Sequence, residues 1–519
     1  MIWDYNNNIE YDLPDMPNGV ARVYPASGAV AMLPLTVANN YTQTIIFCGG
    51  SDMPDEDWGN YSYPAINTWA YPASTDCQRI TPEPADGSTP VYEQDDDMLD
   101  QRTMGQFIIL PDGTLLVING GNNGTAGYAT ATGQTPSLGF MAYGMSLAAG
   151  PVGTPSIYNP NLPSGSRWSS AGLSSSNIPR LYHSSAILLP DASVLVAGSN
   201  PNIDVNTSTI YPTTYDAEIF YPPYFAATTR PNPSGIPSNL TYGGNSFDIT
   251  VPASSYSGSA NDAAANTTVA ITRGGFTTHA MNMGQRYMQL NNTYTVNKDG
   301  SITLHVSQPP PNPNLFQPGP ALLWVAINGI PSNGTLLIVG NGQVSEQPTL
   351  PVSPLPNSIQ LNSASGTAQS GNGSTQSKSH TIEIVAAIVG AIAVIGVAGG
   401  VIGMYVARRR KAAAMHVAPG ASYAMGSTGG GMGTMGGVGV GAYGRGIRSS
   451  DSSAFMPLEH DDHSMVWNAS NVSLTHGPPG SPTHYAPYRD DTDPRASGTG
   501  MSVDFDPYSM VPRSPGARF

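Results

Sequence analysis

The chain has 519 residues, of which only 11% are charged, with 58 Gly, 47 Pro and a formal net charge of −15. So many Gly and Pro residues disfavour long helices and are typical of short strands joined by turns. The negative charge excludes nucleic acid as the expected partner, because binding phosphate requires basic patches. Two cysteines are too few for a disulfide-rich scaffold or a four-cysteine zinc site.

Residues 1–228 contain three related segments, which begin at Arg22, Arg102 and Arg180. Each has an arginine, an apolar run, a turn, a second apolar run and a pair of small residues. Two apolar runs joined by a turn predict a β-hairpin, and their recurrence predicts blades of a β-propeller. At about 50 residues per kelch blade, this length holds four or five blades.

Residues 229–349 have a different pattern, in which alternating strands are separated by turns. This pattern predicts an immunoglobulin-like β-sandwich. Residues 350–383 are rich in Ser and Gly and predict a low-complexity stalk. Residues 407–519 have no sustained periodicity and predict a disordered tail. The expected fold class is therefore all-β.

Residues 384–406 form an apolar run without a charged residue, long enough for a helix that spans a membrane. Residues 408–411 read RRRK, which places the tail in the cytosol and residues 1–383 outside the cell. A single-pass protein of the cell membrane is therefore expected. N-x-S/T triplets, the acceptors of N-glycosylation, agree with an exterior location. They begin at Asn40, Asn60, Asn123, Asn206, Asn239, Asn266, Asn291, Asn333 and Asn372.

The chain begins MIWDYNNNIE, which has neither the basic start nor the apolar run of a signal peptide. A protein with an extracellular N-terminal part normally enters the secretory route through such a peptide. We therefore expect that the natural protein has residues before Met1. Insertion directed by the membrane helix itself is the alternative.

Five further residues are candidates for special chemistry. Cys48 and Cys77 are expected to form a disulfide outside the cell, and a metal or cross-linked role is the alternative. His183, His279 and His305 are the histidines of the predicted folded regions. Taken singly, each is more readily a structural residue than a metal ligand.

An acidic run lies between the first and second repeats and contains Asp95, Asp96, Asp97 and Asp100. Carboxylates are the oxygen ligands that Ca²⁺ prefers, so the run is a candidate calcium site. A solvated acidic loop is the alternative, and the sequence favours it.

The segments RLYHSS and GGFTTHAMNMGQRYMQL resemble fungal glyoxal oxidases and, more distantly, galactose oxidase, which are copper-radical oxidases. The resemblance extends from residue 18 to residue 334, through NGVARVYPASGAVAMLPL, FCGGSDMPDEDWG and GPALLWVAINGIPSNG. It implies a seven-bladed kelch-like propeller followed by an immunoglobulin-like domain. In that family, a loop of the second domain carries a histidine into the central channel of the propeller.

The same resemblance implies a site. His183 and His279 would be equatorial copper ligands, and Tyr182 the axial tyrosinate that accepts the substrate proton. Nitrogen and oxygen ligands of this kind suit tetragonal Cu(II). The implied reaction oxidises a small aldehyde, as its hydrate, or a primary alcohol and reduces O₂ to H₂O₂. One copper ion is the implied cofactor, and a monomer is expected.

The tyrosine radical of the family is formed on a tyrosine cross-linked to a cysteine, and this pair is not found in the sequence. The segments around Cys48 and Cys77 match other parts of the family, and so does RVYPASG around Tyr24. The resemblance therefore implies a truncated oxidase that binds copper weakly and has no radical turnover. The alternative is a non-catalytic propeller protein that binds glycans at the cell surface.

Overall fold

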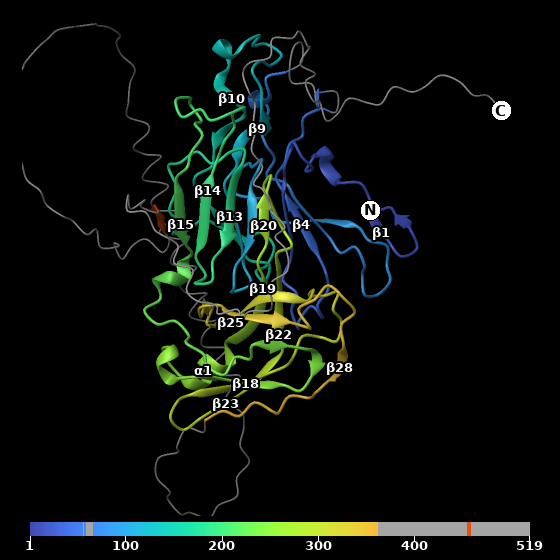
Figure 1. Cartoon of the computed structure of the whole chain (residues 1–519), viewed down its shortest axis with the longest axis vertical. Coiled ribbons are helices and arrows are strands. Elements are labelled where there is room, and N and C mark those ends of the chain that lie inside the picture. The colour runs from blue at the N-terminus through green and yellow to red at the C-terminus, as the bar shows by residue number, and fades with distance from the viewer. Residues whose placement is uncertain (55–56, 59–65, 362–453, 458–519) are drawn as a thin grey trace, which may run out of the picture. The chain divides into compact units, whose positions relative to one another are not determined.

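The computed structural model describes residues 1–54, 57–58, 66–361 and 454–457 (Figure 1). These residues form strands and turns almost throughout, with one short α-helix, α1 (Ala260–Ala265). In these ranges, no helix is long and apolar enough to cross a membrane. The predicted span at residues 384–406 lies outside the described residues, and so does most of the predicted tail.

Three four-stranded antiparallel sheets contain the three sequence repeats. The first has β3 (Ala29–Met32), β4 (Ile45–Cys48), β5 (Cys77–Ile80) and β6 (Tyr92–Gln94). The second has β7 (Gln106–Ile109), β8 (Leu115–Ile118), β11 (Ser156–Tyr158) and β12 (Trp168–Ser169). The third has β13 (Ser184–Leu188), β14 (Val194–Gly198), β15 (Ala217–Tyr221) and β29 (Ala454–Pro457). In each sheet the first two strands are the hairpin that the sequence predicts.

The arginine that opens each repeat joins two backbone segments of its own sheet. Arg22, Arg102 and Arg180 are 8%, 1% and 3% exposed. Each donates to one carbonyl at the end of the second strand and to one just before the third strand. The acceptors, at 2.6–2.9 Å, are Gly49 and Asp76 for Arg22, Asn119 and Thr154 for Arg102, and Gly198 and Asp216 for Arg180. A guanidinium carries five donors in a fixed fork, which explains why arginine recurs at this position.

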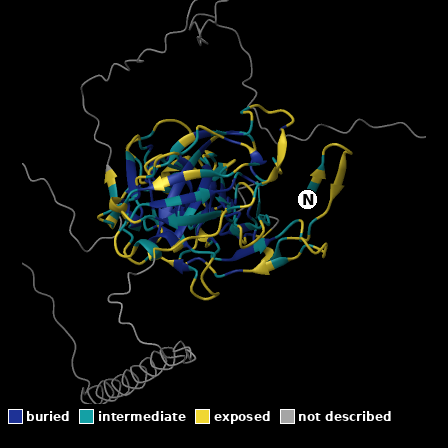
Figure 2. Ribbon diagram, turned by 90° about the horizontal axis from the view of Figure 1, so that it is seen from below, coloured by how far each residue is buried: buried dark blue, intermediate teal, exposed yellow. Residues whose placement is uncertain are grey.

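The described residues 1–228 contain three such sheets, fewer than the four or five blades expected from the length. The remaining residues of this part of the chain form long connections between strands of these sheets. The largest is the pair of β9 (Gly121–Tyr128) and β10 (Ala142–Pro151), inserted between β8 and β11. A separate hairpin of β1 (Ile2–Asp4) and β2 (Ile9–Tyr11) is largely exposed at the N-terminus (Figure 2).

The predicted β-sandwich is present after residue 229. One sheet contains β16 (Asn239–Leu240), β27 (Thr335–Val339), β25 (Gly319–Ile327), β19 (Thr267–Arg273) and β22 (Arg286–Leu290), with β26 (Ile330–Pro331) on β25. The other contains β18 (Phe247–Val251), β24 (Ile302–Val306) and β23 (Asn292–Val296). Fully buried residues of both sheets, such as Ile271 and Leu304, belong to one hydrophobic core.

The sandwich extends beyond the predicted boundary at residue 349. β28 (Thr349–Val352) pairs with β17 (Tyr242–Gly244), and Ile359 exchanges backbone hydrogen bonds with Tyr294 and Val296. The first part of the predicted stalk is therefore ordered by backbone pairing, although its side chains are mostly exposed. Residues 362–383 lie outside the described residues.

One strand comes from the predicted tail. β29 pairs with β15 in antiparallel register, and the ring of Phe455 lies 4.9 Å from that of Phe220. The prediction of disorder therefore fails for residues 454–457, because an aromatic contact and the free edge of β15 hold them.

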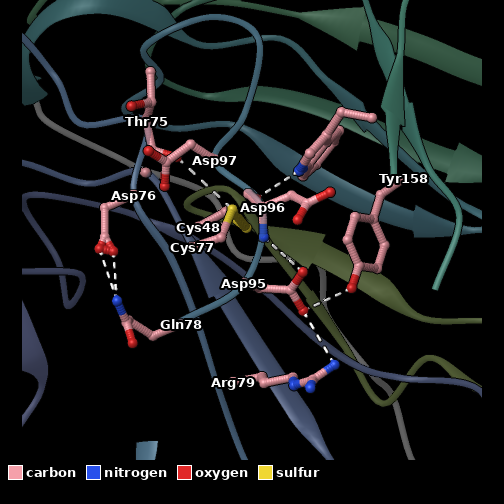
Figure 3. The surroundings of a disulfide bond; sticks show 12 residues. Cys48, Thr75, Asp76, Cys77, Gln78, Arg79, Asp95, Asp96, Asp97 and Tyr158 are labelled. Carbon is pink, nitrogen blue, oxygen red and sulfur yellow. Dashed lines mark hydrogen bonds and ion pairs between the residues drawn. A yellow bond between two sulfur atoms is a disulfide. The ribbon is translucent and has the colours of Figure 1, made fainter. Parts of the chain in front are cut away.

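Cys48 of β4 and Cys77 of β5 form the predicted disulfide, with an S–S distance of 2.06 Å (Figure 3). The two cysteines are directly opposite each other in the sheet. These are the only cysteines in the sequence. While the disulfide is intact, neither can be linked to a tyrosine.

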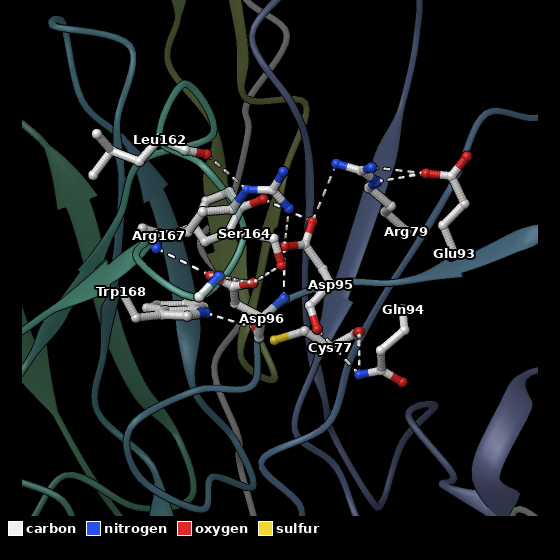
Figure 4. Close-up of polar contacts among 12 residues, drawn as sticks. Cys77, Arg79, Glu93, Gln94, Asp95, Asp96, Leu162, Ser164, Arg167 and Trp168 are labelled. Carbon is white, nitrogen blue, oxygen red and sulfur yellow. Dashed lines mark hydrogen bonds and ion pairs between the residues drawn. The ribbon is translucent and has the colours of Figure 1, made fainter.

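Protein donors occupy the first two carboxylates of the acidic run, Asp95 and Asp96, whereas Asp97 is exposed as a solvated loop predicts (Figure 4). Asp95 is buried and accepts from Arg167 Nη1 at 2.5 Å and from the Tyr158 hydroxyl at 2.8 Å. Asp96 accepts from the backbone N–H groups of Gly165 and Arg167 and from the Ser164 hydroxyl. These hydrogen bonds therefore connect the turn between β11 and β12 of the second sheet to the segment that follows β6 of the first sheet.

These hydrogen bonds also change the acidity of Asp96. Loss of hydration raises the pKa of this carboxyl, but hydrogen bonds from Gly165, Ser164 and Arg167 outweigh it and lower the pKa to about 2. Hydrogen bonds to the charged form stabilise the carboxylate relative to the acid. Asp96 is therefore ionised throughout the physiological range.

Candidate metal site

A hairpin of the sandwich domain carries His279 at its tip. Its strands are β20 (Phe276–Thr278) and β21 (Met281–Met283), and the turn is His279–Ala280. Both turn residues have positive φ, 52° and 65°, as a two-residue type I′ turn requires. Residues other than glycine and asparagine are uncommon in this backbone conformation. The sequence thus places an imidazole where glycine would fit more easily.

The hairpin is fixed to the repeat-containing sheets. Figure 1 shows β20 beside β13, and Gln106 of β7 donates to the Thr277 hydroxyl at 2.8 Å. Gln285, just after the hairpin, donates to the carbonyl of Phe107 at 2.8 Å. These side chains hold His279 of one domain against the other.

Tyr182 and His183 lie immediately before β13, and their rings stack with centroids 3.8 Å apart. Tyr182 is buried and His183 is exposed, with φ of 64° at His183. The His279 ring lies 5.8 Å from Tyr182 and 5.6 Å from His183, centroid to centroid. The structure therefore brings the three predicted site residues together from two domains.

Hydrogen bonds orient both imidazoles. Nδ1 of His183 lies 3.2 Å from the carbonyl oxygen of Asn200, and Nδ1 of His279 lies 2.6 Å from the Thr278 hydroxyl. Each Nε2 therefore remains for a metal ion, which is the usual arrangement of a histidine ligand and its supporting partner.

The environment of His183 favours its neutral form. Loss of hydration and the nearby His279 imidazole lower the pKa of His183, and the carbonyl of Asn200 offsets this only in part. A metal ion binds the neutral imidazole. The pKa shift therefore keeps His183 ready for a metal ion at neutral pH.

Tyr24 is a member of this cluster that sequence reasoning set aside. Its hydroxyl lies 3.3 Å from that of Tyr182, and its ring lies 5.6 Å from that of His279. Tyr24 and Tyr182 both stand two residues after the arginine of their repeat, so aligning the repeats could have paired them. Tyr128 also approaches, with its ring 6.3 Å from that of Tyr182.

A mainly apolar cavity of about 620 Å³ adjoins the cluster. Its walls include Val23, Tyr24, Phe47, His279 and Met281. The cavity is thus in contact with two of the clustered aromatic rings, and its apolar lining suits a small organic molecule.

His305 lies elsewhere, in β24 of the sandwich. Its ring pairs with Asp248 at 2.7 Å and with the Thr295 hydroxyl at 3.0 Å, in agreement with the structural interpretation of this histidine. In the part of the chain that the structure describes, no three His, Cys, Asp or Glu side chains gather as a metal site. Any further protein donor beside His183 and His279 therefore comes from another residue type, and the Tyr182 phenol lies beside both rings.

The fold and the cluster define an all-β protein in which a sandwich domain delivers a histidine to a Tyr–His pair of a repeat-containing domain. Residues 1–224 match the family model described as glyoxal oxidase N-terminus. Residues 230–339 match the model described as galactose oxidase-like, Early set domain. Over these two ranges the chain is therefore similar to glyoxal oxidases and galactose oxidase-like proteins.

Similar curated proteins have related descriptions. The chain is 33% identical over 342 residues to aldehyde oxidase GLOX1 of Arabidopsis thaliana, covering 63% of this chain and 49% of that protein. It is 32% identical over 337 residues to aldehyde oxidase GLOX of Vitis pseudoreticulata, covering 64% and 57%. The chain thus spans about half the length of the curated relatives it matches. The glycan-binding alternative gains no support from these descriptions.

A solved structure is also similar, at 19% identity and a TM-score of 0.42. It is a fungal alcohol oxidase of the AA5 family in complex with copper. The similarity covers 61% of this chain and 54% of that one.

Proposed function

We propose that Tyr182, His183 and His279 bind one copper ion, as part of an oxidase of small aldehydes or primary alcohols that reduces O₂ to H₂O₂. The observation that carries this proposal is the meeting of two imidazoles and a phenol from two domains. The similarity to glyoxal oxidases and the descriptions of the curated relatives support the substrate class.

The donor set fits copper. The Nε2 atoms of His183 and His279 and the phenol oxygen of Tyr182 are nitrogen and oxygen donors of the kind that tetragonal Cu(II) binds. His183 and His279 both have left-handed backbone, which costs about 1–3 kcal/mol at each residue and is often found at functional sites. Hydrogen bonds from His183 Nδ1 to the carbonyl of Asn200 and between His279 Nδ1 and the Thr278 hydroxyl help to hold both residues in this conformation.

Copper, when bound, would exchange single electrons with the substrate and with O₂. Tyr182 as a phenolate would accept the proton of the substrate hydroxyl, because its oxygen stands at the cluster. The apolar walls beside His279 would hold the carbon chain of a small substrate and limit the access of water.

We further propose that the three four-stranded sheets are blades of an incomplete kelch-like propeller. Their common antiparallel strand order and the repeated arginine contacts support this architecture. The resemblance implies seven blades for a complete member of the family.

We propose that residues 1–361 are extracellular and that the chain is a monomer. A single-crossing anchor at residues 384–406 belongs to this proposal only if residues 454–457 leave β15, because one crossing places them on the other side of the membrane. The disulfide supports an oxidising compartment.

Of the predicted glycosylation sites, Asn60 and Asn372 lie outside the described residues, and Asn123 and Asn206 are half-buried. Those with exposed side chains are Asn40, Asn239, Asn266, Asn291 and Asn333.

Titration with Cu(II), followed by calorimetry and electron paramagnetic resonance, tests the site. We expect one ion per chain and loss of binding in His183→Ala and His279→Ala. His305→Ala is the matched control, because this histidine lies outside the cluster. Equal copper binding by all of these variants would refute the site.

Peroxide release from glyoxal, methylglyoxal and a primary alcohol tests the reaction. While the disulfide is intact, neither Cys48 nor Cys77 is free to form a Cys–Tyr cofactor, and we therefore expect little or no turnover from this chain. Rapid turnover would show that the chain supplies the oxidisable group in another way.

A further inference from the structure

We infer that a second cavity, between the repeat-containing sheets and the sandwich, binds a small polyol, a neutral molecule with neighbouring hydroxyl groups. The cavity measures about 430 Å³, a size typical of small-molecule pockets. It shares no lining residue with the cavity beside Tyr24 and His279. The polyol site and the proposed copper site therefore stand or fall separately.

Both domains contribute walls to this cavity. They come from the connection between β3 and β4, the β7–β8 and β11–β12 turns, and strands β19 and β22 of the sandwich. The N–H of Leu35 donates to the carbonyl of Tyr287 at 3.1 Å, and the N–H of Gln289 donates to the carbonyl of Leu35 at 2.8 Å. The β3–β4 connection is thus fixed to β22, and ligand sites are frequent at such domain interfaces.

The hydroxyl of Tyr287 has no hydrogen-bond partner among the residues that the structure describes. Tyr287 is 3% exposed and lines the cavity. Its Oη stands over the β7–β8 turn, 3.6 Å from the position that a Cβ atom of Gly113 would take. Burial raises the pKa of Tyr287, and the nearby Asp112 raises it further, so the hydroxyl keeps its proton. Because buried polar groups normally have partners, this hydroxyl is a site for a ligand oxygen.

Asp112 of the same turn presents an acceptor to the cavity. Its Oδ1 accepts from the N–H and the hydroxyl of Thr114, at 3.0 and 2.7 Å. In the described ranges of the chain, no donor contacts its Oδ2. Loss of hydration raises the pKa of Asp112, so a ligand hydroxyl that donates to Oδ2 stabilises the carboxylate.

The charges on the walls favour a neutral ligand. Asp112 disfavours an anion, and Arg79 of β5, which also lines the cavity, disfavours a cation. Arg79 is paired with Glu93 at 2.8 Å and with Asp95 at 3.5 Å, so its charge is already compensated by protein carboxylates.

The remaining walls match hydroxyl groups on a carbon chain. Thr268 and Gln289 of the sandwich add a hydroxyl and an amide, which donate and accept. Within the described residues, neither side chain has a hydrogen-bond partner. Leu33 and Pro34 add apolar surface for the C–H groups of the ligand. A polyol combines these features, because each carbon carries both an apolar and a hydrogen-bonding part.

The test is saturation-transfer NMR of sorbitol with the full chain, at neutral pH and without copper. We expect saturable binding by the unmodified protein. Asp112→Asn keeps an oxygen for Thr114 but removes the charge, and it is expected to weaken sorbitol binding at least about tenfold, as for a lost hydrogen bond to a charged group. Tyr287→Phe keeps the ring and is expected to weaken binding about threefold to tenfold, as for one neutral hydrogen bond.

The chain offers a matched control variant. Asp191 has the same place in the β13–β14 turn, where its Oδ1 accepts from the N–H and the hydroxyl of Ser193, but it does not line the cavity. Asp191→Asn is therefore expected to bind sorbitol like the unmodified protein. Circular dichroism verifies the fold of each variant. Thermal stabilisation is not a suitable readout, because excluded osmolytes stabilise folded proteins in general.

A matched ligand tests the chemical class. Hexanediol with one hydroxyl at each end has a similar carbon chain but no neighbouring hydroxyls, and it is expected to bind at least about tenfold more weakly than sorbitol. Equal affinity for both ligands would mean that the apolar walls alone select the ligand, and it would overturn the polyol site. Sorbitol binding that does not saturate, or that is equal in the unmodified protein, Asp112→Asn and Tyr287→Phe, would overturn it as well.

Discussion

Arg180 is the residue whose replacement tests how the repeats are stabilised. Its Nη1 donates to the carbonyls of Gly198 and Asp216 at 2.6 and 2.9 Å, and its Nη2 pairs with Glu218 at 2.9 Å. The side chains of both partners in the ion pair are at least nine-tenths buried, at 3% and 7% exposure. We therefore choose Arg180→Met, which keeps the apolar stem and removes every donor.

The expected cost follows from what the variant leaves unpaired. Each buried carbonyl without a donor costs about 1–3 kcal/mol, and removing one partner of a buried ion pair costs about 3–5 kcal/mol. Glu218 keeps the hydroxyl of Ser176 as a donor, which moderates the loss. Because these groups share one network, their costs do not add, and we expect the free energy of unfolding to fall by about 4 kcal/mol, within the range for breaking one buried pair.

Urea unfolding at pH 7, followed by circular dichroism, measures this change. The control is Glu93→Gln, which breaks the exposed pair with Arg79 and is expected to cost less than about 1 kcal/mol. The double variant Arg180→Met, Glu218→Met removes the stranded charge and is expected to recover part of the loss. If Arg180→Met costs no more than the control, the buried arginines are not what stabilises the repeats.

Three other predictions concern separate features. Replacing Cys48 and Cys77 by Ala opens a loop of 29 residues and is expected to lower the free energy of unfolding by about 3–4 kcal/mol, measured against the oxidised protein. Because the pKa of Asp96 is lowered to about 2, its stabilisation is present above about pH 4 and is lost as pH falls towards 2. Asp96→Asn is therefore expected to flatten the acid limb of the stability curve, and an unchanged limb would contradict this. Gln285→Ala removes one of the two glutamine side chains that connect the His279 hairpin and β7 and is expected to weaken copper binding with little change in the unfolding midpoint.

Local patterns in the sequence were sufficient for much of the fold. The three hairpins and the sandwich follow from short-range signals such as apolar alternation and turn residues. The disulfide follows from the expected location of Cys48 and Cys77 outside the cell. The positions of Tyr182, His183 and His279 in one cluster also agree with the resemblance. Each of the hairpins and strands can be recognised from a short segment of the sequence.

Features that depend on contacts distant in the sequence were missed. Asp95 and Asp96 look like a solvated acidic run until Arg167 and the β11–β12 turn are placed against them. The boundary at residue 349 was wrong because β28 pairs with a strand about a hundred residues earlier, which no local pattern indicates. Tyr24 was set aside on its flanking sequence, whereas the repeat geometry brings its hydroxyl to Tyr182.

The pairing of β15 with β29 has a topological consequence. If residues 384–406 cross a bilayer once, the two strands emerge in opposite compartments and cannot meet within one molecule. The strand pair and the single crossing therefore exclude each other. One experiment on the side of the membrane that residue 457 reaches distinguishes them. An epitope inserted after residue 457 would be stained on intact cells if the strand pair forms, and only after permeabilisation if the helix spans.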